Sequence, residues 1–249
     1  MKKSATCICL LLASFSTCVF GQDNTSTIQV QGDFNVYDLD QDGLSNHVLL
    51  KLQGSNNDVI IKQIGDNNKA STYMGVQNPP SFDAQKMKVE MYQTGDNNIA
   101  ITAMDVLPAS LGQNVGTSIK ITQIGDNNYA FAESFGIDGM AVVKQEGNQN
   151  KVEASNADGQ RNKATITQTG NRNMALVGQE LGNDKTVTMT QTGEANYLTS
   201  YQAGNTLAYV AIQTGKENRG ELKQYGNNHT SATTQNGMNN FIQVIQNNH

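Results

Sequence analysis

Apolar and polar side chains alternate along most of this chain, in short runs that end at a glycine-centred turn. Val59 and Ile61 lie four and two residues before Gln63, while the polar Lys62 stands between Ile61 and Gln63. The same arrangement recurs at four further places: Val89 and Met91 before Gln93, Ile119 and Ile121 before Gln123, Val187 and Met189 before Gln191, and Ile242 and Val244 before Gln246. Such alternation buries one face of a strand and exposes the other to solvent, which predicts half-buried β-strands and not helices.

The turns recur with a period of 11 residues, enough for one strand and one turn. Two series of glycines keep this spacing: Gly32, Gly43, Gly54 and Gly65, and later Gly182, Gly193, Gly204, Gly215, Gly226 and Gly237. A fixed period of this kind is typical of solenoids. We therefore predict an all-β fold, a β-solenoid of about nine 22-residue strand-turn-strand-turn coils over residues 22–249. At about 4.8 Å per layer it is roughly 43 Å long.

Two intervals of 30 residues, from Gly65 to Gly95 and from Gly95 to Gly125, interrupt the period. Each equals two units plus an 8-residue insertion. The inserted segments, near 75–85 and 105–117, contain all three prolines of the chain. Proline removes no ladder hydrogen bond outside a sheet, so we predict two loops that leave one edge of the solenoid.

The turns share the pattern Gln-x-Gly-x-x-Asn-x-(Ala/Val). Stacked coils place each Gln over the next Gln and each Asn over the next Asn, which predicts hydrogen-bonded amide ladders inside the solenoid. We expect the ladder and assembly residues to be Gln63, Gly65, Asn68, Gln93, Gly95, Asn98, Gln123, Gly125, Asn128, Gln168, Gly170, Asn173, Gln191, Gly193, Asn196, Gln235, Gly237 and Asn240.

Three turns carry an aspartate directly after the glycine, at Asp66, Asp96 and Asp126. Stacked carboxylates repel each other, and such residues restrain premature assembly in other proteins, as gatekeepers do. Ordinary turn chemistry explains the same three residues equally well.

The N-terminus has the pattern of a signal peptide over residues 1–21. Lys2 and Lys3 precede an apolar run from Ile8 to Phe20, and small or aliphatic residues precede the expected cleavage after Gly21. A lipid anchor on Cys18 is the rival interpretation, but the residues before Cys18 fit a lipoprotein cleavage box poorly. No later apolar run is long enough to span a membrane. We therefore expect a secreted, extracellular protein without a membrane span.

Composition argues against several functions. The net charge is -5 and the basic residues are scattered, so no nucleic-acid partner is expected. All three cysteines lie in the predicted leader, which leaves the chain after it without a thiol. No nucleophile elbow, phosphate loop or metal-ligand spacing is present, so we expect no enzyme activity, no cofactor and no metal site.

One segment has the beginning of a calcium loop. Asp38, Asp40 and Asp42 alternate before Gly43, but the twelfth position is Leu49, where a bidentate glutamate is needed. Calcium binding at this place is therefore the weaker hypothesis.

The repeat resembles the curlin-repeat family, the secreted subunits of curli amyloid fibres. Three copies match the family's Gln, Gly, Asn and Ala positions: Gln63-Gly65-Asn68-Ala70, Gln93-Gly95-Asn98-Ala100 and Gln123-Gly125-Asn128-Ala130. The resemblance implies a fibre subunit that is exported through an outer-membrane pore, nucleated at the cell surface by a nucleator subunit, and used in adhesion and biofilm matrix. It does not separate a major subunit from the minor nucleator.

A monomeric solenoid that presents a flat face to a ligand is the alternative. An ice-binding or adhesin face of this type needs regular outward threonines. Thr165, Thr167, Thr188 and Thr190 form only a patch, so self-assembly, with the chain itself as partner, is the preferred hypothesis.

Overall fold

A computed structural model describes residues 7–10, 18–20, 23–75, 84–104, 115–157 and 159–248. Every regular element within these residues is a β-strand. The strands are β1 (Cys7–Leu10), β2 (Cys18–Phe20), β3 (Thr25–Gln31), β4 (Val36–Asp42), β5 (His47–Ser55), β6 (Asp58–Ile64), β7 (Lys69–Met74), β8 (Ala84–Gln85), β9 (Lys88–Thr94), β10 (Ile99–Met104), β11 (Ser118–Ile124), β12 (Tyr129–Ser134), β13 (Met140–Glu146), β14 (Lys151–Asn156), β15 (Lys163–Asn171), β16 (Met174–Glu180), β17 (Thr186–Glu194), β18 (Tyr197–Asn205), β19 (Ala208–Lys216), β20 (Arg219–Asn227), β21 (Thr230–Met238) and β22 (Phe241–Asn247).

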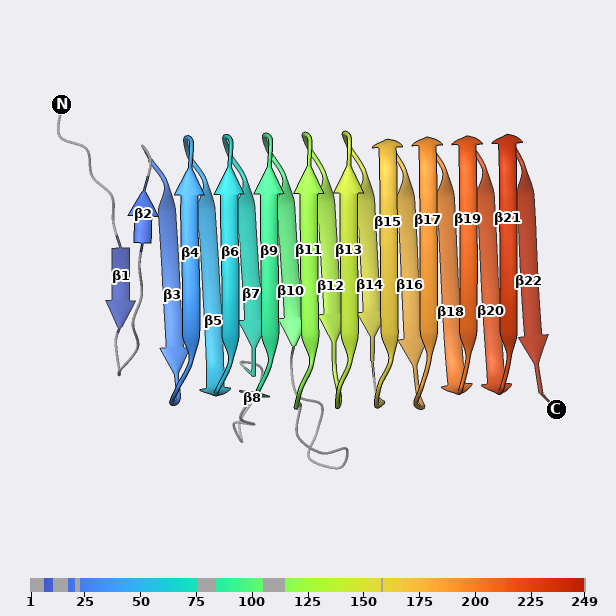
Figure 1. Cartoon of the computed structure of the whole chain (residues 1–249), viewed down its shortest axis with the longest axis horizontal. Coiled ribbons are helices and arrows are strands. Elements are labelled where there is room, and N and C mark those ends of the chain that lie inside the picture. Colours follow the sequence, from blue (N-terminus) through green and yellow to red (C-terminus); the bar gives the residue numbers. More distant parts are fainter. Residues whose placement is uncertain are drawn as a thin grey trace.

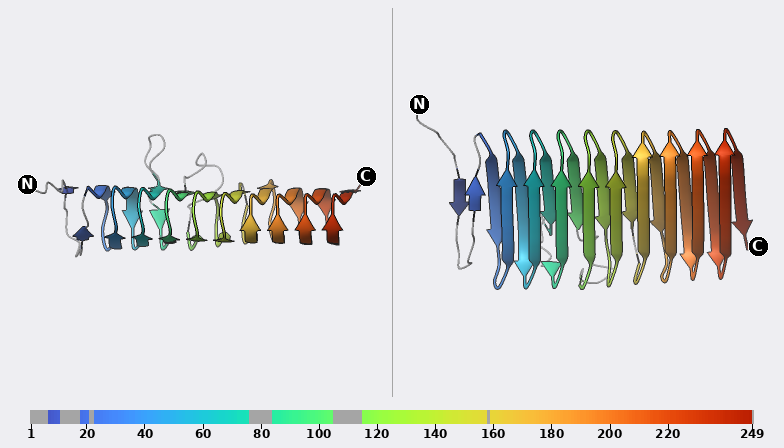
Figure 2. Two further views of the ribbon diagram at one scale, coloured as in Figure 1. Left: turned by 90° about the horizontal axis from the view of Figure 1, so that it is seen from above. Right: turned by 45° about the horizontal axis from the view of Figure 1, so that its top comes forward.

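The strands form two parallel sheets that face each other, and the chain crosses from one to the other at every turn (Figures 1 and 2). Sheet A has the order β1-β3-β5-β7-β10-β12-β14-β16-β18-β20-β22. Sheet B has the order β2-β4-β6-β9-β11-β13-β15-β17-β19-β21. Ten strands in sheet B, less β2 of the predicted leader, give nine coils, so the predicted β-solenoid is confirmed.

Equivalent residues of successive coils pair directly, which keeps every side chain in a column along the solenoid axis. Val59 pairs with Val89 across 30 residues, Ile119 with Ala141 across 22, and Ala141 with Ala164 across 23. Extra residues are therefore taken up between strands, and the strand register is unchanged. The structure does not describe residues 76–83 and 105–114, so most of both predicted loops lies outside the described residues.

Inward side chains from the two sheets form one long core. The predicted inward residues of β6, β9, β11 and β17, from Val59 to Met189, are 0% exposed. The core is tightly filled. Tyr209 is buried, and a Cβ added to Gly220 would meet Leu198 Cδ2 of the neighbouring strand β18 at 2.6 Å. Burial of this apolar face drives the strands together.

The described part of the predicted leader continues both sheets. β1 pairs with β3, and β2 pairs with β4. The signal peptide itself stays a prediction. No helix within the described residues is long and apolar enough to span a membrane.

Candidate functional site

The glutamines of the repeat form one unbroken column inside sheet B. Each Gln side-chain Nε2 donates to Oε1 of the Gln in the next coil, at 2.6 to 3.0 Å. The same Nε2 also donates to a backbone carbonyl of sheet A, such as Ile99 O for Gln123, at 3.0 Å. The column consists of Gln41, Gln63, Gln93, Gln123, Gln145, Gln168, Gln191, Gln213 and Gln235. Both amide hydrogens are thereby used without water, which is why a polar side chain is stable in this core.

The asparagines form a second column at the turn that leads from sheet B to sheet A. Each Asn Oδ1 accepts the backbone N–H of the Asn in the next coil, at 2.8 to 3.2 Å. Asn68 Nδ2 donates to the carbonyl of Gly95 at 2.7 Å, and Asn98 Nδ2 to that of Gly125 at 2.7 Å. The column runs through Asn24, Asn46, Asn68, Asn98, Asn128, Asn150, Asn173, Asn196, Asn218 and Asn240.

Glycine is required between the two columns for two reasons. Gly95 has a φ of 107°, a conformation that residues with a Cβ rarely adopt. A Cβ built there would also lie 2.3 Å from the carbonyl oxygen of Gly125 in the next coil. The close approach lets that carbonyl accept the Asn98 amide. The Gln, Gly and Asn of the motif therefore act together, each linking one coil to the next.

The three turn aspartates lie in adjacent coils along the same rim. Asp96 Oδ1 accepts the backbone N–H of Asp66 at 2.8 Å, and Asp126 Oδ1 accepts that of Asp96 at 2.9 Å. Their carboxylates thus satisfy turn donors while standing close to each other. The gatekeeper role of Asp66, Asp96 and Asp126 stays a prediction.

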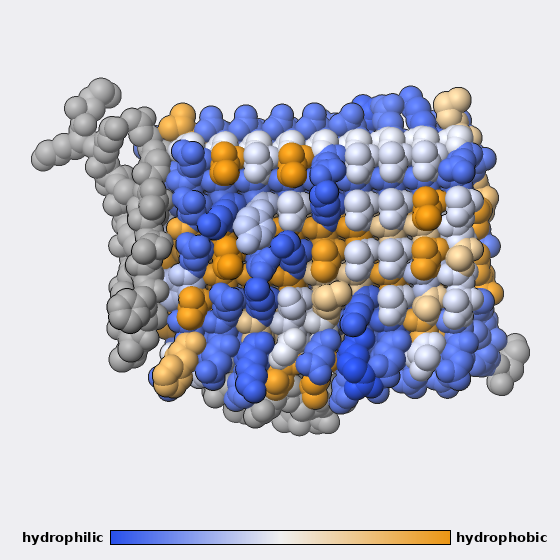
Figure 3. Space-filling model, viewed as in Figure 1, coloured by the Kyte–Doolittle hydropathy of each residue, from blue (hydrophilic) through white to orange (hydrophobic). Residues whose placement is uncertain are grey.

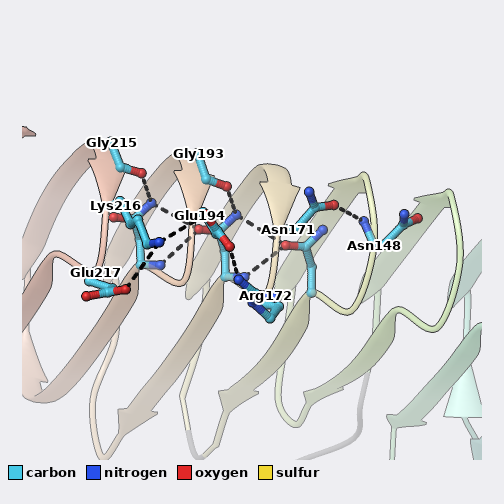
Figure 4. Close-up of polar contacts among 11 residues, drawn as sticks. Asn148, Asn171, Arg172, Gly193, Glu194, Gly215, Lys216 and Glu217 are labelled. Atoms are coloured by element: carbon cyan, nitrogen blue, oxygen red, sulfur yellow. Dashed lines mark hydrogen bonds and ion pairs between the residues drawn. The ribbon is translucent and has the colours of Figure 1, made fainter. Parts of the chain in front are cut away.

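Farther along this rim, amides and ion pairs replace the aspartates (Figure 4). Asn171 Oδ1 accepts the N–H of Asn148 at 2.9 Å. Glu194 lies between Arg172 and Lys216 and forms an ion pair with each, and its Oε2 is 3.5 Å from Lys216 Nζ. Oppositely charged neighbours replace repulsion by attraction here, so the three aspartates form the most negative part of the described rim.

A second Gln column, in sheet A, was not among the predicted site residues. Gln179 Nε2 donates to Gln202 Oε1 at 2.9 Å, Gln202 Nε2 to Gln224 at 2.7 Å, and Gln224 Nε2 to Gln246 at 2.7 Å. Its signal is present in the sequence, because Gln202 and Gln224 each precede a glycine by two residues. The matching Asn is missing from these turns, which hides them from a search for the whole motif.

The outer face of sheet B has two halves (Figure 3). Strands β4 to β13 carry most of the charges, such as Glu90, whose pKa is lowered by hydrogen bonds from Lys120 and Lys88 and by their positive charge. Strands β15 and β17 instead pair threonine with threonine, as in Thr165 with Thr188 and its neighbours. The threonine patch of the sequence is therefore larger than the four residues suggest, since β17 has an outward threonine at four alternate positions.

The candidate calcium residues lie in an extended strand and not in a loop. Asp38, Asp40 and Asp42 follow one another on the outward side of β4, and Asp38 lies 3.5 Å from Lys62. A calcium loop must instead wrap its oxygens around one ion. Within the described ranges, no group of three His, Cys, Asp or Glu side chains is arranged to hold a metal.

Comparison with known families identifies the repeat. The family model of the curlin associated repeat matches three stretches, residues 118–151, 159–193 and 215–247. These stretches contain Gln123, Gln145, Gln168, Gln191 and Gln235 of the sheet B column. A search of curated proteins found no match.

Proposed function

Because the chain belongs to the curlin-repeat family, we propose that it is a secreted structural subunit that assembles head-to-tail into an extracellular curli-type amyloid fibre. The observation that supports this most is the direction of the two columns. From Gln41 to Gln213, each Gln amide of sheet B donates toward the coil that follows, and from Asn24 to Asn218, each Asn Oδ1 accepts from it. A second copy stacked in the same orientation would therefore continue the same bonds from one molecule to the next.

The backbone supports the same arrangement. Parallel strands at the end of a sheet present unpaired N–H and C=O groups, and an added strand pairs with them. The described coils repeat with little change in register, so one coil is a good template for another. Continuous stacking with a repeat near 4.8 Å is the cross-β arrangement.

The resemblance to curli subunits suggests how this chain is exported and what it does outside the cell. We propose that it leaves the cell through an outer-membrane export pore, is nucleated at the surface by a nucleator subunit, and contributes to cell adhesion and biofilm matrix. It is a structural protein and not an enzyme. Its expected partners are other copies of the same chain, the export pore and the nucleator subunit. No nucleic-acid partner and no membrane span are expected.

Assembly from a denatured solution tests this function. Residues 22–249 are diluted from denaturant, thioflavin fluorescence is followed over time, and the product is viewed by electron microscopy. We expect fibres after a lag, and we expect preformed fibres to remove the lag. A clear solution that holds a stable β-rich monomer for days would overturn the proposal.

One observation favours the monomeric alternative, a solenoid that binds a ligand through its face. The outward threonines of β15 and β17 form a regular array. That array does not extend over the charged strands β4 to β13. In the assembly experiment, the alternative predicts the clear solution and the proposed function predicts the fibres.

A further inference from the structure

Three buried polar atoms lie next to each other without a hydrogen-bond partner among the described residues: Ser134 Oγ, Asn156 Oδ1 and Gln179 Oε1. Ser134 pairs with Asn156, and Asn156 with Gln179, so the three occupy consecutive coils of one inward column of sheet A. Their exposed fractions are 0%, 1% and 0%. A buried polar atom without a partner is strongly unfavourable, so three in a row require an explanation.

The column changes its chemistry at these residues. Its earlier members are apolar: Val30, Leu52, Met74 and Met104. Its later members are the hydrogen-bonded series from Gln179 to Gln246. Ser134 and Asn156 stand between the two parts and are shorter than either. Gln179 Nε2 donates to Gln202 Oε1, but the side chain of Asn156 is one methylene shorter and does not donate to Gln179 Oε1 in the same way.

The amide orientations are fixed by neighbours that can only accept. Asn156 Nδ2 donates to the backbone carbonyl of Met140 at 2.9 Å, so its Oδ1 must point the other way. Gln224 Nε2 likewise donates to the carbonyl of Ala208, which fixes Gln224, then Gln202 and then Gln179. Exchanging the oxygen and nitrogen of any of these side-chain amides would bring two acceptor oxygens together. The hydrogen bonds of the column therefore determine that Asn156 Oδ1 and Gln179 Oε1 are the atoms without a partner.

We propose that this break in the sheet A column binds a short file of water molecules. One water donates to both Asn156 Oδ1 and Gln179 Oε1, and a second bridges Asn156 Oδ1 and the Ser134 hydroxyl. Adjacent strands are about 4.8 Å apart, and one water reaches two acceptors at that separation with bonds of about 2.8 Å. Buried waters typically occupy sites with two to four polar partners of this kind.

The site suits water better than a cation. Its three side-chain oxygens are neutral, and burying an ion among neutral groups is far less favourable than burying a water molecule. Calcium also needs six or more oxygens. Ser134 is short, and its Oγ lies close to Gly139, 2.3 Å from where a Cβ on that residue would be. The fourth unpartnered atom, Ser200 Oγ, lies between Val177 and Leu222 in another column and is not part of this file.

NMR transfer of magnetisation from water to side-chain amides tests the proposal on the whole ¹⁵N-labelled chain. Cross-relaxation with a long-lived water is separated from proton exchange by its sign. We expect the signal at the amides of Asn156 and Gln179. Gln191, in the unbroken column of sheet B, is the internal control and should show none. Absence of the signal at Asn156 and Gln179, or its equal presence at Gln191, would overturn the proposal.

Two matched variants move the break. Asn156→Gln lengthens the side chain so that its Nε2 reaches Gln179 Oε1, and the water signal at Gln179 should be lost. Gln202→Asn makes the opposite change, leaves Gln224 Oε1 without a donor, and should create a water signal at Gln224. A signal that persists at Gln179 in the first variant, or no new signal at Gln224 in the second, would contradict the assignment. The measurement on the unaltered chain decides even if one variant does not fold.

Discussion

At the scale of single residues, the motif is explained by contacts between coils and not by contacts within one coil. Gln123 receives a hydrogen bond from Gln93 and donates one to Gln145. Gly95 must lack a Cβ because the next turn lies directly against it. Asn98 holds the following glycine carbonyl. Each motif residue is thus specified by its copy one coil away.

Replacing a rim glycine by alanine should therefore destabilise the fold. Gly95→Ala introduces a Cβ at a positive φ and against the Gly125 carbonyl, which should lower the free energy of unfolding by about 1–3 kcal/mol. Gly178→Ala is the matched control, because its φ is ordinary and its nearest neighbour, Tyr201 Cδ2, lies 3.4 Å from the new Cβ. Denaturant unfolding of both variants checks this, and equal stability of the two would contradict the role given to Gly95.

Removing one amide from the sheet B column should also be unfavourable. Gln123→Leu keeps the side-chain size but leaves Gln93 Nε2, Gln145 Oε1 and the Ile99 carbonyl each short of one partner. Each such loss is worth about 1–3 kcal/mol, so a clear drop in the unfolding midpoint is expected. Thr122→Ala, the outward neighbour on the same strand, should change stability by less than about 0.5 kcal/mol. A harmless Gln123→Leu would mean that the column does not stabilise the fold.

At the scale of strands and turns, the outer faces vary while the inner columns repeat. Glu90 forms ion pairs with Lys88 on its own strand β9 and with Lys120 on the next strand β11: Glu90 Oε1 is 2.7 Å from Lys88 Nζ, and Glu90 Oε2 is 2.8 Å from Lys120 Nζ. Such exposed pairs contribute little individually and are screened by salt. The outward-facing residues can therefore differ from coil to coil without any change in the fold.

This ion-pair group predicts a pH dependence. The folded-state pKa of Glu90 is lowered from its ordinary value of 4.5, so its contribution to stability is present above that value and is lost as the pH falls through the folded pKa. Glu90→Gln should therefore be less stable than the unaltered chain at pH 7, by less than about 1 kcal/mol. The difference should vanish in strong acid. Urea titrations at both pH values measure it, and a difference that grows in acid would contradict the sign.

The turn aspartates give the sharpest test of the gatekeeper hypothesis. Asparagine at positions 66, 96 and 126 keeps an Oδ1 that can accept the same backbone N–H, but it removes three neighbouring negative charges. Less repulsion should shorten the lag of assembly and weaken its dependence on salt. Thioflavin kinetics of the triple variant decide between the two interpretations. An unchanged lag would favour ordinary turn chemistry.

At the scale of the whole molecule, the sequence predicts the solenoid because every strand repeats one inward pattern. The period, the two sheets and the inward face all follow from residues such as Val59, Ile61 and Gln63. The sheet A column was harder to predict, since its members change from Val30 through Ser134 to Gln246. Contacts in that column depend on the lengths of the side chains in neighbouring coils. A repeat pattern describes what the coils share and does not predict these differences.

The central claim is that the coils continue from one molecule to the next along a fibre. X-ray diffraction from aligned assemblies of residues 22–249 tests it most directly. We predict a reflection at about 4.7–4.8 Å along the fibre axis and one at about 10 Å across it, from stacked strands and facing sheets. Assemblies without the axial reflection, or strands that run along the fibre axis, would contradict head-to-tail stacking of the solenoid.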